Sequence, residues 1–423
     1  MRPFWLIRCT ARKAGAPRMT DAGRPRHHPS ALPAGLARRQ PSGTIRPPFM
    51  SEVDQIVGGP DARRSPGVPH GLSTRAVIER RLAGNRDDDA FLVIAVEGGG
   101  LRGVVSGAML IALDDLGITR VADAIVGTSA GAINVAYLAA GRTWDALSAY
   151  YDLLPAHLVR PAHEALRGPL LRMDFLDELF TRHLPLLPEQ LGQHPVPVFA
   201  TVTDVDQQCT AAVALSGDVD VHAWLKASSW LPVLAGRPLR IDGRRWLDGG
   251  VLCPNLATAG ELFQATHLLS VCSRADATEG PSVGERLARP VLNHWAAGLG
   301  DRFLAARQQW AVDAAHLGAY TDAVHRGTRV LRVTPRPHRV GRLTREVGLL
   351  LDGARCGYAQ VMEYFDGQSR CHFGVGHAEH RRRPAAPDAG AEPAMVRAVA
   401  LSMAGASRGA DGDAGRAQPA GVA

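Results

Sequence analysis

One short segment of the sequence carries a residue that could attack an acyl group. Gly127-Thr128-Ser129-Ala130-Gly131 fits the pattern G-x-S-x-G, in which small residues let a strand turn at once into a helix with the serine at the corner. The residues before it, DAIV, are typical of a strand, and an alanine-rich stretch typical of a helix follows. We therefore expect Ser129 to be a nucleophile on a strained turn between Gly127 and Gly131. The alternative is a serine that only caps a helix.

A glycine-rich loop comes earlier, at Gly98-Gly99-Gly100-Leu101-Arg102-Gly103, between the apolar run FLVIAV and a helical stretch. Consecutive glycines expose successive N–H groups, and the following helix points its positive end to the same place. Such a loop holds an anion, either a phosphate or the oxyanion of a carbonyl under attack. A phosphate would indicate a dinucleotide site, with Asp123 as the expected acid further along. An oxyanion hole would lie beside Ser129, since parallel strands bring their C-terminal ends together.

A serine nucleophile needs a base. Asp248-Gly249-Gly250 follows the strand-like RRWL, so its carboxylate could reach Ser129 from a glycine-flanked loop; its alternative is a β-turn aspartate. A Ser–His–Asp triad is the rival arrangement, because several histidines follow Asp248 in the chain order that some triads use. None of them has glycine neighbours on both sides, and we expect structural roles for them: His267, His294, His316 and His325.

Four motifs in this order, EGGGLRG, GTSAGAIN, KASSWLP and WLDGGV, resemble the patatin-like phospholipase family. The likeness covers about residues 89–370, with Glu97 where aspartate is common and Gly250 where alanine often stands. It implies a patatin-like three-layer α/β/α fold with a mostly parallel central sheet and a Ser–Asp dyad. In that dyad Ser129 is the nucleophile, Asp248 is the general base, and the loop Gly98–Gly103 forms the oxyanion hole. We expect Arg102 to brace this loop.

The resemblance implies a lipid acyl hydrolase, similar to phospholipase A or lysophospholipase, that forms an acyl-enzyme without a metal or other cofactor. Alternatives are a triacylglycerol lipase or thioesterase with the same dyad, a catalytically silent lipid-binding module, and, remotely, a dinucleotide-binding oxidoreductase. The expected partner is a lipid or acyl ester, with transient contact to a membrane surface and no nucleic acid. Two histidine pairs that could bind metal lie in the expected tails, His27-His28 and His377 with His380.

Strand-like and helix-like segments alternate along the part of the chain that holds these residues. This alternation indicates a mostly parallel sheet with helices on both faces. Residues 142–195 interrupt the alternation and are expected to form either a cap over the site or a packed pair of surface helices. The predicted strands are 91–96, 124–126, 196–205, 211–215, 239–241, 244–247, 266–272 and 328–333, and the predicted helices are 103–116, 130–140, 222–228, 291–317 and 343–364.

Composition divides the 423 residues into three parts. Residues 1–88 are rich in Arg and Pro and are expected to form a disordered arm, with one helix near 74–83; residues 89–370 form the patatin-like domain, and residues 371–423 form a disordered tail. The first 50 residues carry nine Arg and one Lys against one acid, and they resemble a transit peptide unless Met50 is the true start. With scattered cysteines and no evident signal peptide or membrane span, we expect a cytoplasmic protein, peripheral to a membrane at most.

Overall fold

The computed structural model describes residues 6–8, 71–160, 164, 168–216, 219–254, 257–275 and 280–367. Its centre is a ten-stranded sheet in the order β1-β5-β4-β3-β2-β8-β10-β9, with β7 also paired to β4 and β6 paired to β7. The strands are β1 (Leu6–Arg8), β2 (Leu92–Val96), β3 (Ala124–Thr128), β4 (Val198–Asp204), β5 (Cys209–Ala214), β6 (Leu239–Ile241), β7 (Arg244–Asp248), β8 (His267–Val271), β9 (Asp322–His325) and β10 (Thr328–Val333).

The five central strands, β4, β3, β2, β8 and β10, run parallel to one another, whereas the strands at both edges pair antiparallel. All five residues of β2, β3 and β8 are buried, as expected for strands covered on both faces. The expected α/β fold with a mostly parallel sheet is therefore confirmed.

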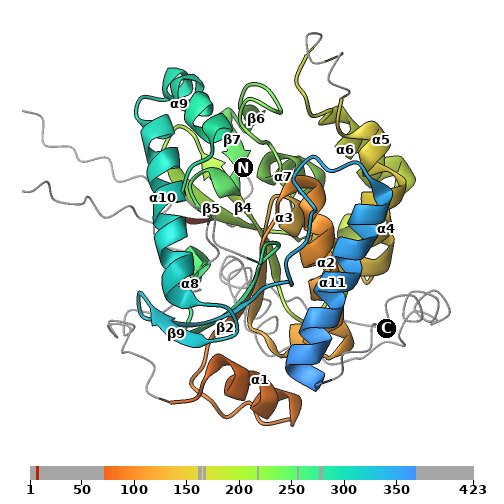
Figure 1. Cartoon of the computed structure of the whole chain (residues 1–423), viewed down its shortest axis with the longest axis vertical. Helices are drawn as coiled ribbons and strands as arrows, with labels where there is room; N and C mark the ends of the chain where they lie inside the picture. Colours follow the sequence, from red (N-terminus) through yellow and green to blue (C-terminus); the bar gives the residue numbers. More distant parts are fainter. Residues whose placement is uncertain are drawn as a thin grey trace, which may run out of the picture.

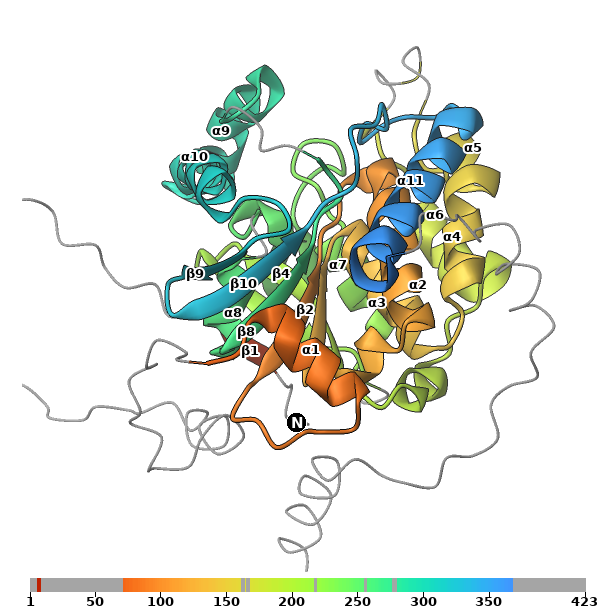
Figure 2. The ribbon, with the colours of Figure 1, turned by 60° about the horizontal axis from the view of Figure 1, so that its bottom comes forward.

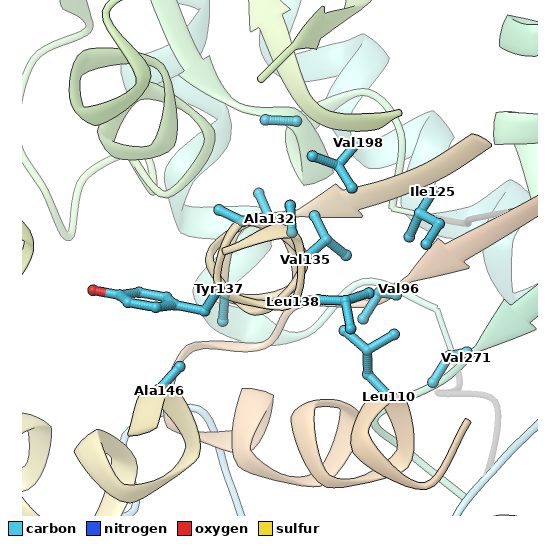
Figure 3. Close-up of a cluster of buried hydrophobic side chains, with 14 of the residues drawn as sticks. Val96, Leu110, Ile125, Ala132, Val135, Tyr137, Leu138, Ala146, Val198 and Val271 are labelled. Carbon is cyan, nitrogen blue, oxygen red and sulfur yellow. The ribbon is translucent and has the colours of Figure 1, made fainter. Parts of the chain in front are cut away.

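Helices cover both faces of this sheet and give three layers (Figures 1 and 2). Alternate residues of β2 enter different cores: Leu92, Ile94 and Val96 pack with α2, α3 and α11, whereas Val93 and Ala95 pack with α8. Figure 3 shows α3 lying between the sheet and α2, with Val135 and Leu138 among the side chains that fill the interface. The period of two along the strand thus determines which side chains reach which helical layer.

The helices have these bounds: α1 (Thr74–Leu82), α2 (Gly103–Asp115), α3 (Ala130–Ala139), α4 (Thr143–Asp152), α5 (Leu154–His157), α6 (Asp174–Glu178), α7 (Val221–Ser228), α8 (Ala257–Phe263), α9 (Val283–Trp295), α10 (Leu299–Leu317) and α11 (Val347–Asp366). One short 3-10 turn lies within the glycine loop, at Gly100–Arg102, and another follows Asp248, at Gly249–Val251. Among the described residues no helix is long and apolar enough to cross a membrane.

The single helix predicted over 291–317 is wrong. The chain forms two helices, α9 and α10, because Ala296 is extended (φ −152°) and Gly298 adopts a left-handed conformation (φ 81°, ψ −5°). Glycine takes this conformation without the penalty that a Cβ imposes, so the chain turns at Ala297-Gly298 between the two helices. The N-terminal helix, α9, begins eight residues earlier than predicted, at the capping box of Ser282 and Glu285.

Several elements were not predicted. They are β1, α8 and β9. In residues 142–195, where surface helices were one of the two expectations, the chain forms the short helices α4 to α6, which pack beside α2 and α3 on one face of the sheet (Figure 2). β1 lies within the expected N-terminal arm, and α1 agrees with the helix expected near residues 74–83. Four cysteines lie among the described residues, and of these Cys253 is buried whereas Cys209, Cys272 and Cys356 are partly exposed.

Candidate active site

Ser129 stands at the corner between β3 and α3 in a conformation that non-glycine residues rarely adopt (φ 56°, ψ −128°). The turn is tight because the chain packs against itself on both sides of the serine. A Cβ on Gly131 would lie 2.2 Å from the carbonyl oxygen of Val96, and a Cβ on Gly127 would lie 2.3 Å from the carbonyl oxygen of Gly131. Both glycines of the elbow are therefore required by close backbone contact, and the strain is concentrated at Ser129.

Strand pairing within the sheet brings Asp248 close to Ser129. Along one edge of β4, residues 198–201 pair with β3 and residues 202–204 pair with β7. β7 therefore continues the line of β3 from the opposite direction, and its last residue, Asp248, arrives where β3 turns into the serine elbow. Thr201 and Thr203 on β4 bind the two sides: Thr201 Oγ1 lies 2.6 Å from Thr128 Oγ1, and Thr203 Oγ1 donates to the Asp248 carbonyl at 2.9 Å.

The Asp248 side chain is buried, with 2% of its residue surface exposed. Its Oδ1 accepts the Gly250 N–H at 2.7 Å, while Oδ2 is buried with no donor in full hydrogen-bond geometry among the described residues. Burial raises the pKa of this carboxyl above its ordinary value, although the Ser129 hydroxyl, the Gly250 N–H and the charges of Arg307 and Arg342 act in the opposite direction. The carboxyl therefore faces Ser129 and is a stronger base than an exposed aspartate.

The glycine loop passes directly beside the serine. A Cβ on Gly98 would lie 2.7 Å from Ser129 Cβ, and Gly99 and Gly100 both have positive φ (143° and 61°). The N–H of Leu101 donates to the Arg342 carbonyl at 2.9 Å, so Leu101 does not offer a free donor. The N–H groups of Arg102 and Gly103 also bond to backbone carbonyls within the loop. Of the six expected donors, Gly98, Gly99 and Gly100 are those whose N–H groups have no acceptor among the described residues.

A buried network of side chains fixes the shape of this loop. Arg102 Nε donates to Ser273 Oγ at 2.9 Å, and the Ser273 hydroxyl lies 2.9 Å from both Glu97 Oε2 and the Gly98 carbonyl. Burial raises the pKa of Glu97, but the positive charges of Arg274 and Arg102 and the Ser273 hydrogen bonds outweigh it and bring the pKa to about 2. Glu97 is thus ionised, and Arg102 supports the loop from below, as its predicted bracing role requires.

Ser228 contacts the nucleophile from a third direction. Its hydroxyl accepts the backbone N–H of Ser129 at 3.0 Å, and its side chain is fully buried at the end of α7. Ser228 belongs to the KASSWLP run, so the sequence marked the segment without indicating this contact. The neighbouring Ser229 differs, because its Oγ has no hydrogen-bond partner among the described residues.

An apolar cavity opens beside Ser129. It holds about 710 Å³ of space free of atoms, part of it open to solvent. Its polar lining is limited to Ser129, Ser229, Arg342 and the tyrosines, and most of the remaining lining is aliphatic. Residues 142–195, the segment expected to cap the site or to pack as surface helices, supply much of this wall. Wall residues from α3 and this segment include Ile133, Ala146, Ala149, Leu154, Leu171 and Leu176.

Two arginines that the sequence did not indicate lie near the Asp248 carboxylate. Arg307, on α10, donates to the Gly250 carbonyl at 2.9 Å, and Arg342 lines the cavity with Ser129. Glu285 at the start of α9 joins the two, at 3.2 Å from Arg307 Nε and 3.4 Å from Arg342 Nη2. The two arginines share one acidic partner, so this side of the cavity carries positive charge toward Asp248.

The structure does not bring the rival residues to Ser129. Asp123 accepts from Arg81 at 2.8 Å and from the Leu92 N–H at 2.7 Å, at the N-terminal end of β2, opposite the glycine loop. His267 pairs in register with Leu92 at that same end, and His325 lies near it on β9, while His294 and His316 are exposed. The described residues include no cluster of three or more His, Cys, Asp or Glu side chains that could hold a metal; both histidine pairs considered as ligands lie outside the described residues.

A serine elbow beside a glycine loop, with an aspartate arriving from a distant strand, matches the order of motifs in the sequence. Residues 94–259 match the family model of the patatin-like phospholipases. The resemblance drawn from the motifs is thus confirmed over this span, which includes Ser129 and Asp248 and supports a lipid hydrolase. No curated protein matches the chain.

Solved structures similar to this chain include two proteins of low identity. VipD from Legionella pneumophila is 14% identical over 66% of this chain and 67% of its own, with a TM-score of 0.34. Human GIVD cytosolic phospholipase A2, in complex with methyl gamma-linolenyl fluorophosphonate, is 11% identical over 73% of this chain and 62% of its own, also with a TM-score of 0.34. The chain thus spans less than two thirds of the length of the human protein.

Proposed function

We propose that the protein is a serine hydrolase of lipid acyl esters that works through a Ser129–Asp248 dyad. The observation that carries the proposal is the meeting of a strained serine and a buried carboxylate at the mouth of an apolar cavity. The carboxylate takes the proton of the Ser129 hydroxyl as the oxygen attacks the ester carbonyl, and Asp248 returns that proton to the departing alcohol. Water then attacks the acyl-Ser129 carbonyl while Asp248 takes its proton, and Asp248 passes that proton to Ser129 Oγ as the bond to the acyl group breaks and the fatty acid leaves.

The oxyanion formed in both steps is held by the N–H groups of Gly98, Gly99 and Gly100. These donors are fixed before substrate arrives by the Glu97–Ser273–Arg102 network, so they need little reorganisation when charge develops. Each such donor is typically worth about 3–4 kcal/mol of barrier. Esters suit this site better than amides, because an alkoxide leaving group needs less protonation than an amine.

The substrate class follows from the two walls of the cavity. The aliphatic wall from α3 and residues 142–195 fits an acyl chain, since each buried methylene contributes about 0.8 kcal/mol. Arg342 on the opposite side favours an anionic headgroup near the scissile ester. A phospholipid or lysophospholipid therefore fits better than a neutral triacylglycerol.

The test uses a fluorophosphonate probe, a soluble chromogenic ester and a panel of glycerolipids. We expect the probe to label Ser129 alone, and Ser129→Ala and Asp248→Asn each to lose ester hydrolysis while remaining folded. Ser229→Ala is the matched control, since this serine also lines the cavity and should stay active. Full activity in either dyad variant, or labelling at another serine, would refute the dyad; labelling without turnover would indicate a silent lipid-binding module.

A further inference from the structure

Helix α9 presents an apolar stripe to solvent. Val283 and Leu287, at positions i and i+4, are 73% and 71% exposed, the two highest values among the large apolar side chains of the described residues. Pro290 and His294 continue the same line at i+7 and i+11 and are also exposed. The opposite side of the helix packs inward through Leu292, which is fully buried against the turn to α10. The stripe is thus not the core-facing side of this helix.

The stripe lies beside the entrance to the active site. Glu285, two residues before Leu287, points inward and pairs with Arg307 and Arg342, which flank Asp248 and the cavity. Leu343, next to Arg342, lines the cavity and is 39% exposed, which adds apolar surface at the mouth. Figures 1 and 2 show α9 and the segment before α11 at one end of the molecule and α1 at the other.

The charge around the stripe is positive. Arg286 follows Glu285 on α9, is exposed, and pairs with no acid among the described residues. Arg302, near the start of α10, is exposed in the same way. Apolar side chains beside arginines are the combination that binds a helix to the surface of an anionic bilayer, with the apolar face in the acyl region and the cations among the headgroups.

We propose that α9 is an interfacial anchor that inserts Val283 and Leu287 into an anionic lipid surface. The nature of the partner rests on the proposed lipid hydrolase function, because a substrate held in a bilayer must leave it at the cavity mouth. Glu285 links the anchor to Arg342, so docking at α9 places this mouth against the lipid.

The test compares full-length variants in vesicle binding and in hydrolysis of a soluble monomeric ester. Co-sedimentation uses vesicles of phosphatidylcholine alone and of equal parts phosphatidylcholine and phosphatidylglycerol. We expect the double variant Val283→Ser/Leu287→Ser to lose at least about tenfold in affinity for the mixed vesicles. Arg286→Gln should lose about fivefold on mixed vesicles and nothing on phosphatidylcholine. Leu82→Ser, 45% exposed on α1 at the far end, is the control and should bind as the wild type does.

Hydrolysis of the soluble ester should stay unchanged in all three variants, because none of these residues contacts the dyad. Vesicle binding by the double variant at the wild-type level overturns the proposal. The proposal is also overturned if the wild type is a dimer, the double variant is a monomer, and the double variant still binds vesicles, since a second copy of the chain would then cover the stripe. A third outcome separates this proposal from the proposed function. If the wild type does not hydrolyse the ester but binds vesicles, and the double variant does not bind them, the hydrolase function is refuted and the lipid-binding surface is supported.

Discussion

Replacing Ser228 tests whether the elbow needs support from outside its own turn. Ser228→Ala removes the acceptor of the Ser129 N–H, which lies 3.0 Å from Ser228 Oγ in a fully buried position. A buried N–H left without a partner costs about 1–3 kcal/mol. Water has little access to replace the lost oxygen. The backbone at Ser129 therefore either relaxes toward another conformation or keeps a buried N–H without a hydrogen bond, which lowers the stability of the active conformation.

The size of the effect follows from where that cost falls. If all of it raises the barrier, 1–3 kcal/mol corresponds to about 5- to 150-fold in rate. We therefore expect kcat to fall about tenfold or more while KM changes little, because the cavity wall that binds the acyl chain is untouched. A modest loss of thermal stability should accompany it. The assay is steady-state hydrolysis of a soluble ester, with the melting temperature measured in parallel.

Ser229 provides the matched control. It is adjacent in sequence and lines the cavity, yet its hydroxyl has no partner among the described residues. Ser229→Ala should therefore keep kcat within about twofold. The reasoning is refuted if Ser228→Ala keeps wild-type kcat, or if both alanine variants lose activity equally.

Three further predictions concern the charge and the cavity. Burial raises the pKa of Asp248 above the usual carboxyl range, so activity should fall as the pH decreases toward that raised pKa. The charge of Arg342 lowers this pKa, so in Arg342→Gln the acid limb of the kcat/KM profile should move to higher pH. Arg345→Gln should leave the acid limb in place. Ala149→Leu narrows the cavity, so kcat/KM should fall about fourfold for each methylene that no longer fits and stay unchanged for an acetyl ester; equal losses for both esters would contradict this. Asp248→Asn should raise the melting temperature near neutral pH, because burial disfavours the ionised carboxylate there, whereas Asp204→Asn should lower stability by about 1–3 kcal/mol through its contacts with Arg244 and two backbone N–H groups; a lower melting temperature for Asp248→Asn would mean that the buried charge is fully compensated.

The sequence predicted the central sheet well, because its strands are continuous apolar runs that end in glycine motifs. FLVIAV and THLLSVC became β2 and β8, and the serine elbow fell between β3 and α3 as expected. Each of these features is local: a run of apolar residues, a turn that needs small side chains, and a helix that follows. The family motifs then indicated which distant segment would supply the aspartate.

Contacts that depend on three-dimensional pairing could not be predicted in this way. Nothing in the local sequence shows that the Leu101 N–H is taken by the carbonyl of Arg342, far along the chain. The division of the predicted helix 291–317 had a local signal, Ala297-Gly298, but apolar spacing on both sides concealed it. Arg307 lies on an amphipathic helix where an arginine is ordinarily a solvated residue, and only the packing of α10 against Gly250 brings it toward Asp248.

The burial of Asp248 links these observations to catalysis. A carboxylate exposed to water would be too weak a base for a serine hydroxyl, whereas one buried without compensation would be protonated at neutral pH. The structure lies between these limits: desolvation raises the pKa, and the Gly250 N–H, Ser129 and two arginines oppose it. Because Glu285 holds both arginines and begins α9, the helix proposed to meet the lipid surface is joined by one ion pair to each arginine that tunes the base. Docking at a bilayer would remove water from this cluster and strengthen its charge interactions, so the pH dependence of hydrolysis should differ between vesicle-bound and free enzyme.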